Sequence, residues 1–209
     1  QQLPSLEKNY SKEHEKFYQL PFLENTKEAQ QKIMEAANNC KSTYEGMAGV
    51  VTNLTQMNRD MFPIDDATQF ATVVQQLVIA SGKGESEALS TQKLLARAFQ
   101  SSIVDASTLT RIQRTAPALY EQIASAIGVS TEELQNMAKQ GQLTSQQLKD
   151  AIIGSKDAAQ TAFDNLDFSI SDAMTNIRNQ WGYFVDDINS TVGVTQTIAK
   201  GMVSAFSRL

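Results

Sequence analysis

The stretch that most constrains this chain is residues 117–154, where helix start and stop signals follow one another closely. Pro117 suits the first position of a helix, because the N–H that proline lacks is not needed there. Apolar residues then recur at the spacing of one helical face, as at Leu119 and Ile123. Gly128 can adopt the left-handed conformation that ends a helix. The stretch therefore predicts a helix that begins at Pro117 and stops at Gly128.

Two further helices are predicted in the same stretch by repeated capping signals. In each, a serine or threonine precedes a glutamate or glutamine by three residues. This is the spacing of a capping box, in which the two side chains satisfy each other's backbone N–H groups. An apolar stripe and a glycine that can end the helix follow each pair. The pairs are Ser130 with Glu133 and Thr144 with Gln147, and the glycines are Gly141 and Gly154.

The rest of the chain is predicted to be helical as well. Apolar residues recur at helical spacing on both sides of the central stretch, whereas apolar runs that alternate with period two are absent. The predicted fold class is all-α, with roughly eight to ten helices. We expect a compact set of short helices in the middle and longer helices at both ends.

Helix starts outside the central stretch are predicted from weaker signals. Ser42 and Glu45 have the spacing of another capping box. Asp65 or Asp66 is expected to cap the next helix. That helix carries apolar residues on nearly every side around Phe70, so we expect it to lie buried at the centre of the fold.

Three parts are expected along the chain. Residues 1–20 are expected to form an amphipathic helical extension and residues 21–168 a helical core domain. Residues 169–209 are expected to form long amphipathic helices that lead into the remainder of a longer chain. The first part has an apolar seam with heptad spacing, which fits either a coiled coil between copies or packing on its own domain. The candidate residues for self-association are Leu3, Leu6, Tyr10, Phe17, Trp181 and Phe184.

The sequence offers no constellation for catalysis, a cofactor or a metal ion. Its one cysteine, Cys40, and its one histidine, His14, lie far apart and lack a supporting pattern. Cys40 is expected to be a partly buried thiol near a helix end, and His14 a solvated side chain. No apolar run is long enough to span a bilayer. A stripe at residues 44–61 contains methionines and fits either a core face or an adaptable binding surface.

Residues 131–153 can also be interpreted as a DNA-binding helix-turn-helix. Gln146, Gln147 and Lys149 would then be the base-reading side chains. The chain carries a net charge of −5, and this segment contains no arginine that could contact phosphates. These observations argue against DNA binding and against a nucleic-acid partner.

The central stretch resembles a helical segment near the N-terminus of the tail tape-measure proteins of long-tailed bacteriophages and prophages. In that family an alanine-proline pair opens a helix, and a Gly-Val-Ser pattern with a later leucine and a Gly-x-(Ile/Leu)-Thr pattern follow. The corresponding residues here are Ala116-Pro117, Gly128-Val129-Ser130, Leu134 and Gly141-Gln142-Leu143-Thr144. The resemblance extends from about Leu20 to about Ser190.

This resemblance implies a structural protein of the phage tail. Members of the family set the length of the tail tube during assembly and leave the tail when DNA is ejected. The implied partners are tail-tube and tail-tip proteins, assembly chaperones and other copies of the chain. The implied locations are the lumen of the virion tail and, during assembly, the host cytoplasm. No enzymatic activity or cofactor is expected. The alternative interpretation is a helical adaptor or regulatory module that binds one partner protein.

Overall fold

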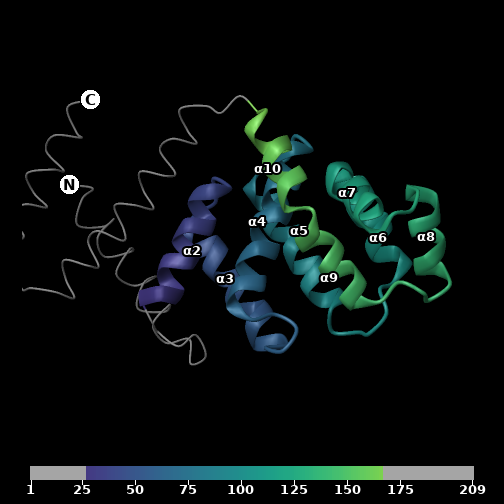
Figure 1. Cartoon of the computed structure of the whole chain (residues 1–209), viewed down its shortest axis with the longest axis horizontal. Helices are drawn as coiled ribbons and strands as arrows, with labels where there is room; N and C mark the ends of the chain where they lie inside the picture. The colour runs from purple at the N-terminus through teal and green to yellow at the C-terminus, as the bar shows by residue number, and fades with distance from the viewer. Residues whose placement is uncertain (1–26, 167–209) are drawn as a thin grey trace, which may run out of the picture. The chain divides into compact units, whose positions relative to one another are not determined.

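The computed structural model describes residues 27–166, which form nine α-helices and no β-strand (Figure 1). The chain divides into two compact units, Gln1–Leu166 and Asp167–Leu209, and the second lies outside the described residues. The prediction of an all-α fold is confirmed. The helices are α2 (Lys27–Asn39), α3 (Tyr44–Met57), α4 (Ile64–Ala80), α5 (Glu85–Ala98), α6 (Ala106–Thr115), α7 (Pro117–Ile127), α8 (Thr131–Lys139), α9 (Ser145–Gly154) and α10 (Lys156–Asp164).

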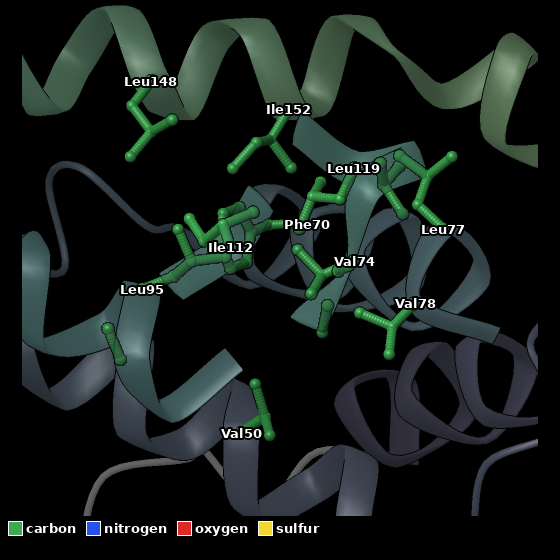
Figure 2. Packing of buried hydrophobic residues seen from close by; sticks show 14 of the residues in the cluster. Val50, Phe70, Val74, Leu77, Val78, Leu95, Ile112, Leu119, Leu148 and Ile152 are labelled. Carbon is green, nitrogen blue, oxygen red and sulfur yellow. The ribbon is translucent and has the colours of Figure 1, made fainter. Parts of the chain in front are cut away.

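Helix α4 lies at the centre of the described bundle. It packs against α2, α3, α5, α7, α9 and α10. Its apolar side chains are buried on nearly every side, and Figure 2 shows Phe70, Val74 and Leu77 close to Leu119 and Ile152 from two other helices. Complete burial of a large apolar side chain contributes about 1.5–3 kcal/mol. The prediction of a central helix that is buried nearly all round is therefore confirmed.

Three phenylalanine rings connect α4 with the elements on either side of it in sequence. Phe62 lies in the loop before α4, Phe70 lies within α4, and Phe99 directly follows α5. The ring centroids are 5.4 Å apart for Phe62 and Phe70, 5.0 Å for Phe62 and Phe99, and 5.4 Å for Phe70 and Phe99. All three pairs are edge-to-face, the arrangement that the ring quadrupole favours.

Two glutamines of α4 satisfy the carbonyl groups at the ends of neighbouring helices. The last carbonyls of a helix have no partner within it and need one from elsewhere. The Nε2 of Gln76 donates to the carbonyl of Asn39 at the end of α2, at 3.2 Å. The Nε2 of Gln69 donates to the carbonyl of Ile153 near the end of α9, also at 3.2 Å. The central helix thus orients two neighbours by polar as well as apolar contacts.

The predicted boundaries of α7 and α8 are confirmed. Pro117 is the first residue of α7, and Gly128 ends that helix in the left-handed conformation, with φ 83° and ψ 28°. The Oγ of Ser130 accepts a hydrogen bond from the N–H of Glu133 at 3.1 Å and so caps α8, but the predicted capping box is only half formed, because the Glu133 side chain does not bond the Ser130 N–H. Gly141, after α8, also has a positive φ of 68°.

The predicted start of α9 is confirmed, whereas the backbone at its end differs from that at the ends of α7 and α8. The Oγ1 of Thr144 accepts from the N–H of Gln147 at 3.1 Å, and the N–H of Thr144 donates to Gln147 Oε1 at 3.0 Å. Gly154 is the last residue of α9, as predicted, but unlike Gly128 and Gly141 it does not have a positive φ. Ser155 after it stays near the helical region (φ −83°, ψ 9°), and its hydroxyl donates to the carbonyl of Ala151 at 2.7 Å. α10 therefore begins directly.

The predicted capping box of α3 is wrong by one residue. Thr43, rather than Ser42, is the N-cap, and its Oγ1 accepts from the N–H of Gly46 at 3.2 Å. The methionine stripe belongs to the core, because Met47 is buried and Met57 and Met61 are partly buried against the core cluster.

The predicted cap of α4 is also wrong. Pro63 occupies the N-cap position, and α4 begins at Ile64 without a side-chain cap. Asp65 and Asp66 lie inside the first turn, where negative charge is favoured by the helix dipole. Their carboxylates are directed to lysines on other helices instead.

Candidate functional site

The residues predicted to mediate self-association all lie outside the described part of the chain. They are Leu3, Leu6, Tyr10, Phe17, Trp181 and Phe184. Their role in self-association stays a prediction.

Cys40 is fully buried, which is deeper than the partly buried position predicted for it. Its Sγ donates to the carbonyl of Ala36 at 3.0 Å, and burial raises the pKa of the thiol. A buried, protonated thiol is a poor nucleophile. Within residues 27–166, no group of three or more His, Cys, Asp or Glu side chains is arranged to hold a metal ion. His14 lies outside the described residues.

Glu85, in the first turn of α5, is a partly buried side chain that bonds a turn far from it in sequence. Its Oε1 accepts three hydrogen bonds from the α2–α3 turn: from Ser42 Oγ at 2.9 Å, from Thr43 N–H at 2.7 Å and from Thr43 Oγ1 at 2.9 Å. In a capping box, a side chain three residues after the N-cap bonds the N-cap N–H. Here Glu85, 42 residues away, makes that bond. The box at the start of α3 is therefore completed by another helix.

Gly46 explains why the sequence did not reveal this arrangement. It occupies the position where a capping box has glutamate or glutamine, and a Cβ there would lie 2.9 Å from Thr43 Oγ1 and 3.2 Å from Glu85 Oε1. The carboxylate of Glu85 thus fills the space that a local side chain would need. In the sequence, only the glycine three residues after Thr43 indicates that this cap lacks a local partner. That glycine does not indicate which distant residue supplies the carboxylate.

The two aspartates of α4 form ion pairs with lysines on opposite sides of that helix. Asp65 pairs with Lys32 of α2 at 2.7 Å, and this hydrogen bond is the main cause of the raised pKa of Lys32. Asp66 pairs with Lys149 of α9 at 2.5 Å. The Nζ of Lys149 also lies 5.5 Å from the centroid of the Phe62 ring, within the range of a cation–π contact. These carboxylates therefore join helices and are not a catalytic pair.

The helix-turn-helix interpretation fails on the placement of its candidate base-reading residues. The side chain of Lys149 is only 8% exposed and is paired with Asp66. Gln147 forms the capping box at the start of α9, and the Nε2 of Gln146 donates to Asp150 Oδ1 at 2.8 Å. Lys149 is therefore buried in an ion pair and Gln147 is bonded in a cap, so of the three candidates only the exposed Gln146 lies outside the contacts that hold the fold.

No helix in residues 27–166 is both long enough and apolar enough to cross a membrane. Within the same residues, the Lys32–Asp65 and Lys149–Asp66 pairs and the bonds of Glu85 join one helix to another.

Comparison with known proteins gives one result that agrees with this arrangement. No curated protein and no solved structure matches the chain with significance. The family model described as "Tape measure protein" matches residues 23–190, which include every described helix and most of the chain. The chain therefore belongs to the tape measure protein family.

Proposed function

We propose that this chain is a folded helical part of a tape measure that sets tail-tube length during phage assembly and is released when DNA is ejected. The observation that carries this proposal is membership of the tape measure family over residues 23–190. A helix rises by about 1.5 Å per residue, so a mostly helical ruler converts residue count into distance.

Residues 27–166 themselves are poorly suited to measuring. As one continuous helix they would span about 210 Å, whereas α4, the longest described helix at 17 residues, spans about 25 Å. Six of the other described helices pack against α4. We therefore assign to this domain an anchoring role at one place on the ruler, and to the remainder of the tape measure the length itself.

The three parts expected from the sequence enter the proposal unchanged. Residues 21–168 are the core domain, residues 1–20 are an amphipathic helical extension, and residues 169–209 are long amphipathic helices that lead into the remainder of the protein. Copies of the chain associate through these two terminal parts, at Leu3, Leu6, Tyr10, Phe17, Trp181 and Phe184. Partners are tail-tube and tail-tip proteins and assembly chaperones, in the host cytoplasm during assembly and then in the lumen of the virion tail. The chain supplies no enzymatic activity.

Insertions of equal length at two places in the full-length protein test this proposal in the phage. A helical insertion of about 20 residues at Gly82–Lys83, an exposed turn between α4 and α5, should leave tail length unchanged. The same insertion in a long helical segment outside the domain should lengthen the tail by about 30 Å, measured by electron microscopy. Equal lengthening at both places would contradict the anchoring role. No lengthening at either place would contradict the tape-measure role and favour the adaptor alternative.

A further inference from the structure

Helix α8 lies at one end of the described bundle, away from the central helix α4 (Figure 1). It packs chiefly on α6 and α7, whereas α7 and α9, the helices before and after it, pack directly on α4 and on each other. The buried residues of α8 are Leu134 and Ala138, and α7 and α9 each bury a larger set. Because packing supplies most of the stability of a short helix, α8 is held less strongly than its two neighbours in sequence.

Two side chains connect α8 to α6 and α7 by hydrogen bonds. The Nε2 of Gln135 on α8 donates to the carbonyl of Ala106 at 3.2 Å and to Thr110 Oγ1 at 3.0 Å, both on α6. The hydroxyl of Tyr120 on α7 donates to the carbonyl of Thr131 at 2.7 Å. When such bonds break, the freed groups bond water instead, so the net cost of each is small.

The chain is fixed on both sides of α8. Before the helix, the N–H of Gly128 bonds the carbonyl of Ala124 at 3.0 Å, and after it the carbonyl of the buried Leu143 accepts from the N–H of Val104 at 2.9 Å. Between these points, Gly128 and Gly141 have positive φ values of 83° and 68°. Glycine changes backbone conformation with little steric restriction. The segment that contains α8 can therefore leave the bundle while its two ends stay attached.

We propose that residues 128–142 form a lid that detaches from α6 and α7 as a unit while the helices packed on α4 stay folded. A helix of nine residues is only marginally stable alone, so α8 loses its own backbone hydrogen bonds when it detaches. The open state keeps the packing among α4, α7 and α9 and uncovers the hydroxyl of Tyr120 and the side of α6 at Ala106 and Thr110. This inference concerns the bundle alone and does not depend on the proposed function.

Residue-resolved hydrogen exchange of the whole 209-residue chain tests the lid. The core amides of α8 should exchange at least about tenfold faster than those of α7 and α9. They should also share one denaturant dependence, weaker than that of α7 and α9, because a partial opening exposes less surface than global unfolding does. Equal protection and equal denaturant dependence in all three helices would overturn the proposal, since α8 would then open only when the bundle unfolds.

Ile152→Val distinguishes opening of the lid from global unfolding. Ile152 is fully buried in α9, and Figure 2 shows it beside residues of α4 and α7, so its packing persists when α8 detaches. Losing one buried methyl group should speed the exchange of α7 and α9 about threefold to tenfold. Exchange of α8 should change by less than about twofold. An equal increase in all three helices would overturn the proposal.

Gln135→Ala removes bonds that exist only while the lid is closed. It should speed the exchange of α8 about threefold to tenfold. Lys139→Ala is the matched control, because it shortens an exposed side chain of the same helix, and it should change α8 exchange by less than about twofold. Unchanged α8 exchange in Gln135→Ala, or an equal change in Lys139→Ala, would contradict the proposal. So would a Gln135→Ala chain that cannot fold, because α8 would then support the whole bundle.

Discussion

The α2–α3 turn and the α8–α9 turn begin with the same backbone motif, but the second has one more residue before its capping threonine, and different contacts complete each turn. In each, a residue with positive φ follows a helix: Lys41 at 55° in the first turn and Gly141 at 68° in the second. In each, the next N–H bonds a carbonyl five residues back, at 2.9 Å for Ser42 and 2.8 Å for Gln142. A threonine then caps the next helix.

The difference lies in what completes each turn. In the α8–α9 turn a glycine takes the left-handed position, and Gln147 bonds the N–H of the capping threonine from three residues away. In the α2–α3 turn a lysine takes the left-handed position, and Glu85 of α5 bonds the N–H of Thr43. The N–H of the capping threonine is therefore bonded from within its own helix in one turn and by another helix in the other. The α8–α9 turn has tertiary contacts as well, because the Leu143 carbonyl accepts from the Val104 N–H at 2.9 Å and the Ser145 N–H donates to the Ser102 carbonyl at 3.0 Å.

The largest effect is expected when the distant carboxylate is removed. Glu85→Ala removes the carboxylate that accepts from Ser42 Oγ, from Thr43 N–H and from Thr43 Oγ1, and it should lower the unfolding free energy by about 2 kcal/mol. Glu85→Gln keeps an oxygen acceptor and should recover part of this loss. Denaturant unfolding measures the change. Glu87→Ala, an exposed residue of the same helix turn, is the control, and an equal loss there would show that Glu85 has no special role.

Replacing the glycine of the local turn should have the next largest effect. Gly141→Val places a branched side chain at a φ of 68°, which should cost about 1–2 kcal/mol of unfolding free energy. Gly154→Ala is the control, because Gly154 lies at a helical position with nothing within 4 Å of a new Cβ, and it should not destabilise. The midpoints of thermal unfolding of the two variants, each compared with that of the unaltered chain, measure these changes in stability. A tolerated valine at position 141 would mean that the turn does not depend on its glycine.

The opposite change in the other turn should stabilise the protein. Lys41→Gly removes a side chain from the left-handed region and should raise the unfolding free energy by about 0.5–1 kcal/mol. The midpoint of urea unfolding should rise accordingly. A lower midpoint would show that contacts of the Lys41 side chain outweigh the backbone strain, and the two turns would then be less alike than their geometry indicates.

Two glycines of α3 should respond in opposite directions to alanine, with the smallest effects. Gly49→Ala meets nothing within 4 Å and should stabilise by about 0.5–1 kcal/mol, because alanine favours a helix. Gly46→Ala brings a Cβ to 2.9 Å from Thr43 Oγ1 and 3.2 Å from Glu85 Oε1, so it should lose this gain and destabilise. Equal stabilisation by both would mean that the cap completed by Glu85 is not closely packed.

The same distinction explains what could be predicted from the sequence. The all-α fold and the central position of α4 follow from the spacing of apolar residues. The start of α7 follows from Pro117, and the starts of α8 and α9 follow from pairs of residues three positions apart. Each of these signals depends only on residues that lie close together in the sequence, so it can be recognised without knowing the fold.

The predictions that were wrong fall where the decisive partner is distant. The Ser42 cap was wrong because Glu85 holds the turn in a register in which Thr43 is the cap. The Asp65 and Asp66 caps were wrong because the N-cap is Pro63, two or three residues earlier, and the two carboxylates meet lysines of α2 and α9. Glu85 itself could not have been identified, because nothing within three or four residues of it marks it as a cap of α3.

The most direct test of this account compares two isolated peptides, residues 27–57 with the α2–α3 turn and residues 131–154 with the α8–α9 turn. Short helices are only marginally stable alone, so the comparison concerns the caps and not the overall helix content. NMR chemical shifts should show a helix N-cap at Thr144 in the second peptide and none at Thr43 in the first. An equally formed cap at Thr43 in the absence of Glu85, or no cap at Thr144, would contradict the account.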